Sequence, residues 1–161
     1  MPPPKEPSVY VDACVLLAYV SNEENRAAAV QSVLDDARTH KINLFTSVLS
    51  ITEVAYVAAD NAEQSTSEDS IDQLWTPASP IALIDISQRV AREARSVIRQ
   101  ARVREFGGVR SADAIHLASA RLQRCSRFFT YEKEATRERW DSLISARVSE
   151  PYADSPRLGF R

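Results

Sequence analysis

Short apolar runs alternate with longer amphipathic segments along most of this chain. The apolar runs have the length of buried strands, and the segments between them repeat their apolar residues at helical spacing. Strands that alternate with helices favour a parallel sheet with helices on both of its faces. The sequence therefore predicts an α/β protein with three layers, α/β/α, around a central, mainly parallel sheet of four to five strands.

The predicted elements follow one another without an internal repeat. The strands are expected at residues 8–11, 42–45, 81–86 and 127–130, with a shorter fifth strand at 146–148. The helices are expected at residues 13–20, 23–39, 46–59, 68–75, 87–104, 111–122 and 134–143. A polar stretch at residues 60–67 is expected to be a loop.

The length of 161 residues suits one domain with a core of its own. We expect a single domain over residues 1–161, with its core at about 8–148 and loose termini at 1–7 and 151–161. No stretch approaches the roughly 20 apolar residues that span a bilayer, and the first seven residues lack the apolar segment of a secretory signal. Because Cys14 and Cys125 form no metal-binding or Cys-x-x-Cys pattern, we interpret them as reduced thiols of a cytoplasmic protein. The lack of a spanning segment leads us to expect no association with membranes.

The net charge of −2 hides a bias toward arginine, which supplies 17 of the 20 basic residues. Arginine suits bidentate contact with phosphate, although base composition of a genome produces the same bias. Four arginines share the polar face of the predicted long helix, namely Arg92, Arg95, Arg99 and Arg102. This face fits either ordinary solvation or contact with a phosphate backbone.

Three acidic residues lie in otherwise apolar segments. Asp12 ends the first strand, Glu53 lies within residues 48–57, and Asp113 opens the apolar helix at 111–118. A charged carboxylate is rarely buried unless it is paired or binds a metal. Since ligands of parallel sheets bind at the carboxyl ends of the strands, Glu132, which follows the fourth strand, is a fourth candidate at the same edge.

A cation would explain why these acids lie together. Two unit charges 4 Å apart repel by roughly 4 kcal/mol at an effective dielectric near 20. Carboxylate oxygens are hard ligands, so Mg²⁺ or Mn²⁺ is the expected ion. Each acid also has a simpler interpretation, such as a turn for Asp12, a solvent-facing side chain for Glu53 or Glu132, and a first-turn acid of a helix for Asp113. The prediction depends on the set of four.

Four segments of the chain, taken in order, resemble the PIN-domain family, and within it the VapC toxins of type II toxin–antitoxin pairs. These segments are Tyr10–Leu17, Thr46–Val54, Ser111–Ala120 and Phe128–Lys133. The resemblance implies a PIN-like fold and a Mg²⁺- or Mn²⁺-dependent endoribonuclease. It also implies that Asp12, Glu53, Asp113 and Glu132 are the catalytic, metal-binding acids. Glu132 takes a place that is more often Asp, and Cys14 takes one that often holds a small polar residue.

Several polar neighbours of the acids are candidates for binding substrate phosphate. They are Ser47, Arg110, Ser111 and Thr130. The two serines are equally suited to helix capping. His116 lies one turn beyond Asp113, and we interpret it as a packed, hydrogen-bonded histidine rather than a general base.

The resemblance further implies an RNA substrate, a cognate antitoxin and a homodimer. A second hypothesis is a PIN module with a weakened site that binds RNA or a protein without cleavage. A third is a phosphatase with an aspartate nucleophile. That class carries a second Asp two residues after the first, and here Cys14 stands at that place.

Overall fold

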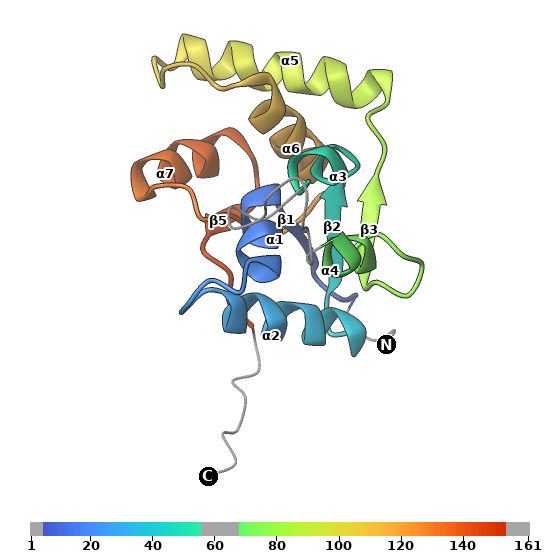
Figure 1. Ribbon diagram of the computed structural model, residues 1–161. Coiled ribbons are helices and arrows are strands. Elements are labelled where there is room, and N and C mark those ends of the chain that lie inside the picture. Colours follow the sequence, from blue (N-terminus) through green and yellow to red (C-terminus); the bar gives the residue numbers. More distant parts are fainter. Residues whose placement is uncertain (1–4, 56–67, 154–161) are drawn as a thin grey trace.

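Five parallel strands form the central sheet of the computed structural model, which describes residues 5–55 and 68–153 (Figure 1). The strands are β1 (Ser8–Val11), β2 (Asn43–Ser47), β3 (Ile81–Ile84), β4 (Arg127–Phe129) and β5 (Arg147–Ser149). Their order across the sheet is β3-β2-β1-β4-β5, and every neighbouring pair is parallel. The predicted α/β fold and its strands are therefore confirmed.

Helices cover both faces of this sheet. They are α1 (Ala13–Val20), α2 (Ala27–Arg38), α3 (Leu49–Glu53), α4 (Glu68–Gln73), α5 (Gln88–Val103), α6 (Ser111–Leu122) and α7 (Glu134–Leu143). In the described part of the chain, no helix has both the length and the apolar character needed to cross a membrane.

The central strand β1 explains why its sequence is apolar on both sides. Val9 and Val11 pack in one core cluster with residues of α1 and α2. Tyr10 points to the opposite face and packs in a second cluster with residues of α6 and α7. Successive side chains of a strand alternate between its faces, so a strand covered on both faces has an apolar residue at nearly every position.

Aromatic rings fill the second cluster. The rings of Tyr10 and Phe128 stack with centroids 5.0 Å apart, and the edge of Trp140 meets Phe128 at 5.9 Å. Small residues allow α5 to pack closely on α6, because Ala94 lies with Ala114 and Ala118 in a third cluster. The helix α5 thus forms the outermost element on this side, at the top of Figure 1.

Two helices differ from their predicted limits by more than two residues at one end. The helix expected from residue 23 begins at Ala27, because Asn22 and Asn25 adopt left-handed backbone conformations with φ of 49° and 66°, and asparagine tolerates this region well. The helix expected at 46–59 begins at Leu49 and is described only to Glu53. The predictions for residues 56–67, and for the loose termini at 1–4 and 154–161, lie outside the described residues.

We expect Phe128→Ala to lower the free energy of unfolding by about 3–5 kcal/mol, because it removes a ring at the centre of the second core cluster. Chemical unfolding followed by circular dichroism measures this change. Val103→Ala is the matched control, since that side chain is 83% exposed and surface substitutions usually change stability by about 0.5 kcal/mol or less. Equal losses in the two variants would contradict the assigned core.

Candidate active site

The first candidate acid, Asp12, lies where β1 ends and α1 begins. Its backbone N–H still follows the sheet, donating to the carbonyl of Phe129 at 3.2 Å, and its side chain caps the helix by accepting from the Val15 N–H at 3.3 Å. Asp12 is only 7% exposed. Burial therefore raises the pKa of Asp12, and hydrogen bonds from Cys14 and Thr130 partly offset the effect.

Cys14 orients the carboxylate of Asp12. Its thiol donates to Asp12 Oδ1 at 2.8 Å and lies 3.4 Å from Thr130 Oγ1, while its sulfur accepts the Tyr131 N–H at 3.3 Å. Burial, and then the charge of Asp12, raise the pKa of Cys14, so the thiol remains protonated and serves as a donor. A thiol is a weak donor, but here its position is fixed from two sides.

Glu53 is held by a chain of hydrogen bonds that begins in the sheet. The Ser47 N–H donates to the Tyr10 hydroxyl at 2.9 Å, that hydroxyl lies 2.7 Å from His116 Nδ1, and His116 Nε2 lies 2.6 Å from Glu53 Oε2. An ionised carboxylate can only accept, so His116 carries a proton on Nε2. In a neutral imidazole Nδ1 then accepts from Tyr10, whose pKa is raised well above its ordinary value by burial.

This chain explains the role of His116 better than general-base chemistry does. The side chain is buried, and both of its ring nitrogens are engaged. The prediction of a packed, hydrogen-bonded histidine is confirmed. Tyr10 was not predicted as part of the site. A tyrosine at the centre of a buried strand needs a partner for its hydroxyl, and that requirement could have identified it.

Asp113 and Glu132 line one cleft of about 450 Å³, together with Gly108, Arg110 and Arg139. Arg110 binds Asp113 through two contacts, Nε to Oδ2 at 2.9 Å and Nη2 to Oδ1 at 3.4 Å. Asp113 raises the pKa of Arg110, and the charges of Glu132 and Glu53 act in the same direction. One guanidinium group thus lies in the combined field of three of the four candidate acids.

The structure connects the four acids through shared neighbours. Asp12 and Glu132 are linked through Thr130, whose hydroxyl accepts the Glu132 N–H at 3.2 Å. Glu53 and Asp113 are linked through α6, which carries both Asp113 and His116. Within residues 5–55 and 68–153, no three histidine, cysteine or acidic side chains form a ready-made metal-binding group. At least three of the acids are instead held by other residues of the chain.

The four candidates for substrate contact fall into two pairs. Ser47 and Thr130 are fully buried, and Ser47 Oγ accepts the Leu49 N–H at 3.1 Å at the start of α3. Arg110, which lines the cleft, and Ser111, which begins α6, are both exposed. Arg139, which was not predicted, also lines the cleft and donates to the carbonyl of Phe106 at 3.1 Å.

The fold and the acids at the carboxyl edge of the strands define a class, a parallel α/β protein with an acid-rich site at the end of its sheet. Within that class the family is clear, because the family model of the PIN domain matches residues 9–139. The chain belongs to the PIN-domain family. A search of the curated proteins found no match.

Solved structures share this fold at low sequence identity. VapBC2 from Rickettsia felis bound to a promoter DNA fragment has a TM-score of 0.64 at 11% identity, covering 89% of this chain and 98% of that one. A toxin–antitoxin complex from Klebsiella pneumoniae has a TM-score of 0.60 at 19% identity, covering 90% and 98%. Mycobacterium tuberculosis VapC20, a toxin that cleaves the sarcin–ricin loop, has a TM-score of 0.58 at 10% identity, covering 86% and 98%.

We expect Tyr10→Phe to lower the free energy of unfolding by about 1–3 kcal/mol, because it leaves the buried Ser47 N–H and His116 Nδ1 without their partner. Tyr19→Phe is the control, since its hydroxyl bonds Gln31 at a half-buried position, and a smaller loss is expected there. Nitrogen NMR of the imidazole tests the same chain. A neutral His116 with its proton on Nδ1 would contradict the arrangement.

We expect Asp12→Asn to stabilise the metal-free protein at neutral pH. The raised pKa of Asp12 means that the folded protein retains this proton to a higher pH than the unfolded chain does, so wild-type stability falls as the pH rises through that interval. Asn keeps the helix cap but does not ionise. Chemical unfolding in EDTA from about pH 4 to pH 7 should show the variant gaining on the wild type. A difference that is constant, or shrinks, with rising pH would show that burial of the charge is not its cause.

Proposed function

We propose that this protein is a Mg²⁺- or Mn²⁺-dependent endoribonuclease and the toxin of a toxin–antitoxin pair. The observation that carries the proposal is the buried carboxylate of Asp12 at the end of the central strand of a PIN fold. Nothing in the helix cap requires a charged residue there, since Asn or Ser caps equally well. The helix cap therefore does not explain why this residue is an acid, whereas binding of a cation would explain it.

The donor chemistry of the site fits a hard divalent ion. Asp12, Glu53, Asp113 and Glu132 offer carboxylate oxygens only, and the one thiol nearby stays protonated, which disfavours softer metals. We propose these four acids as the metal ligands and the catalytic residues. When bound, such an ion supplies an activated water and stabilises the leaving oxygen of the phosphodiester.

The residues around the acids prepare the site for this chemistry. Cys14 and the Val15 N–H fix the direction of the Asp12 carboxylate, and His116 fixes one oxygen of Glu53. Such outer hydrogen bonds orient metal ligands and often matter for affinity. Arg110 neutralises Asp113 and is 77% exposed at its side chain, so its guanidinium is free to turn toward a substrate phosphate once a cation has replaced it.

The partners follow from the family and the structural relatives. The structures from Rickettsia felis and Klebsiella pneumoniae are toxin–antitoxin complexes, and VapC20 is a toxin that cleaves the sarcin–ricin loop. By analogy we propose RNA as the substrate, a small antitoxin as the inhibitor and a homodimer as the assembly. We propose the exposed Arg110 and Ser111 as phosphate contacts. Ser47 and Thr130, the other two predicted contacts, are fully buried and hydrogen-bond within the chain, so we propose that they position the site instead. The cytoplasmic location inferred from the cysteines stays a prediction.

A second candidate function is binding without cleavage. It is favoured by the contacts of Asp113 with Arg110 and of Glu53 with His116, which hold these acids so that the described part of the chain has no ready-made metal site. The phosphatase hypothesis is weaker than either. Its second acid is replaced by Cys14, whose half-buried thiol donates to Asp12 and has a raised pKa, so it cannot act as the acid or base of such a reaction at neutral pH.

We expect Asp12→Asn and Asp113→Asn each to reduce RNA cleavage by more than the roughly 10–100-fold that loss of an outer partner of a metal ligand causes. Cleavage of labelled RNA in Mg²⁺ and in Mn²⁺ measures the effect, and circular dichroism confirms that the variants fold. Glu134→Gln is the control, because this exposed acid of α7 lies outside the cleft residues. Full cleavage by both Asn variants would refute the site.

Calorimetric titration with Mn²⁺ separates the first two candidates. A nuclease should bind the ion in a manner that depends on Asp12 and should then cleave RNA. A module that only binds RNA should show no Asp12-dependent heat and should bind RNA equally well in EDTA and in Mn²⁺.

A further inference from the structure

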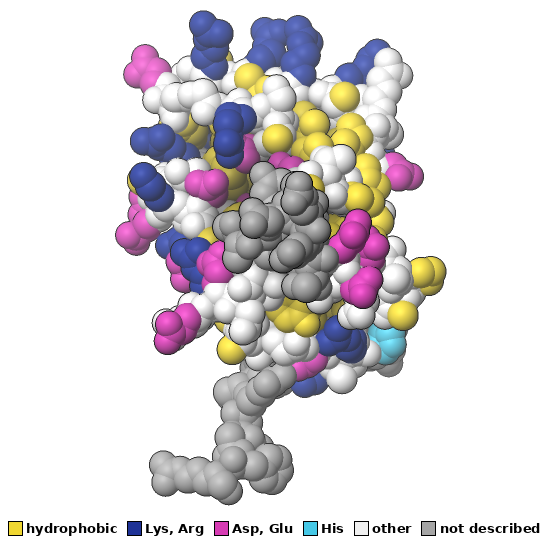
Figure 2. Space-filling model, in the orientation of Figure 1, with side chains coloured by type: hydrophobic (Ala, Val, Ile, Leu, Met, Phe, Trp, Pro, Cys, Tyr) yellow, Lys and Arg dark blue, Asp and Glu magenta, His cyan; other side chains and the backbone are white. Residues whose placement is uncertain are grey.

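The outward face of α5 carries a stripe of arginines that the fold does not use. The apolar face of the helix packs inward through Val90, Ala94, Val97 and Ala101. On the opposite face, Arg92, Arg95, Arg99 and Arg102 lie three or four residues apart and are all exposed. Figure 2 shows Lys and Arg side chains gathered along the top of the molecule, where Figure 1 places α5.

These arginines lack the charge partners that a merely solvated helix face would carry. The helix has five arginines and a single acid, Glu93, in a chain whose net charge is −2. Glu93 pairs with Arg121 of α6 at 3.3 Å. Among residues 5–55 and 68–153, none of the four stripe arginines forms an ion pair. Like charges at these spacings destabilise a helix, so the stripe works against the fold that carries it.

A groove runs between these side chains. It has a volume of about 440 Å³ and is lined by Arg92, Arg95 and Arg99 along the helix, by Arg104 at its end, and by Ser96 and Val103 between them. The rise of 1.5 Å per residue gives the stripe a length of about 15 Å from Arg92 to Arg102. The arginines that line the groove follow one another along the helix, as the phosphates of one extended strand would.

The groove leads toward the acidic cleft. Arg104 donates from Nη1 to the carbonyl of Ser142 at 2.6 Å, which ties the end of α5 to α7. The adjoining residues of α7, Arg139 and Leu143, line the cleft that contains Asp113 and Glu132. Basic residues therefore extend from the stripe, through Arg104 and Arg139, to Arg110 beside the candidate metal ligands.

We propose that the α5 groove binds the phosphate backbone of single-stranded RNA and leads the strand into the acidic cleft. This inference rests on the proposed nuclease function, and it assigns the surface that holds the substrate. Arginine presents a planar fork that matches phosphate oxygens. An external polyanion would relieve the repulsion within the stripe, and continuity with the cleft favours the substrate over a protein partner as that polyanion.

The test measures how RNA affinity depends on salt. A fluorescein-labelled 20-nucleotide oligouridine is titrated with the whole protein in EDTA, which prevents metal-dependent cleavage, and anisotropy is recorded at several salt concentrations. Each lost phosphate contact to a single strand should reduce the slope of log K against log[salt] by about 0.7. Arg95→Gln with Arg99→Gln should therefore reduce the slope by about 1.4.

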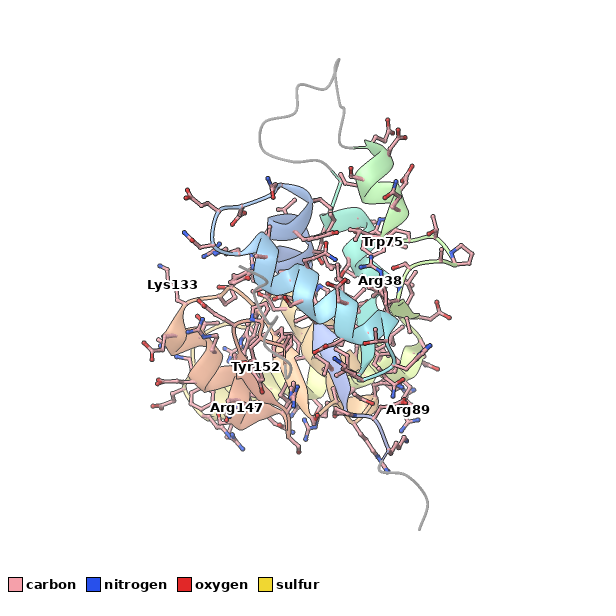
Figure 3. All side chains as sticks on the ribbon, turned by 90° about the horizontal axis from the view of Figure 1, so that it is seen from below. Arg38, Trp75, Arg89, Lys133, Arg147 and Tyr152 are labelled. Atoms are coloured by element: carbon pink, nitrogen blue, oxygen red, sulfur yellow. The ribbon has the colours of Figure 1, made fainter. Side chains whose placement is uncertain are left out.

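A double variant of equal charge change is the control. Arg38→Gln with Arg147→Gln removes two exposed arginines from α2 and β5, both labelled in Figure 3, which views the molecule from the side opposite α5. The control should keep the wild-type slope. Glutamine forms helices readily, and circular dichroism verifies that α5 survives. If the α5 variant and the control have the same slope, the groove is not the RNA-binding surface.

Cleavage assays separate this proposal from the proposed function. If both hold, the α5 variant cleaves the long RNA with a higher KM and an unchanged kcat, as expected for loss of uniform binding. If the slope falls in the α5 variant but the wild type cleaves no RNA in Mg²⁺ or Mn²⁺, the groove stands and the nuclease assignment fails. If the wild type cleaves RNA and the α5 variant matches it in slope and KM, the nuclease stands and the groove fails.

Discussion

The central strand β1 ends on a carboxylate that has almost no access to water, and much of the surrounding structure depends on that fact. Both faces of β1 are covered, so the first polar residue after Val11 is necessarily near the core. Burial raises the pKa of Asp12, and hydrogen bonds from Cys14 and Thr130, the nearby His116 and the Val15 N–H oppose this effect only in part. A buried charge with so few partners is unfavourable for the isolated fold. A bound cation, as proposed above, would remove this cost.

The same constraint explains the hydrogen bonds on the far side of the sheet. Tyr10 alternates with Val9 and Val11 and therefore points from the strand toward α6, where its hydroxyl reaches His116. His116 in turn holds Glu53, which arrives from the end of β2 through the single turn of α3. Two candidate ligands from different elements are thus positioned by one strand. A shift of β1 by one residue would exchange its faces and disconnect both.

The sequence alone predicted the order of elements, because it is a local and periodic property. Of the four acids that the sequence proposed for the site, the structure places Asp113 and Glu132 in one cleft. The strand at 8–11 and the helices at 13–20, 111–122 and 134–143 have the predicted limits. The start of α2 was wrong, since the left-handed conformations of Asn22 and Asn25 depend on how the chain turns between two packed helices. The pairings of Arg110 with Asp113 and of Tyr10 with His116 were also out of reach, because a pattern identifies a candidate acid but not the rotamer or partner that holds it.

The two ends of the proposed RNA path carry opposite charges, with arginines along α5 and acids in the cleft. Asp113 and Glu132 line one cleft, and Arg110 lies in the field of Asp113, Glu132 and Glu53 together. The arginines of α5 lie farther out, on a helix whose inner face is fixed by Ala94 against Ala114 and Ala118. A polyanion drawn first to the outer stripe would meet the acids only where a divalent ion had reversed the sign of their field. Under the proposed function, metal binding would therefore decide whether a bound strand can enter the cleft, because the cation offsets the negative charge of the acids.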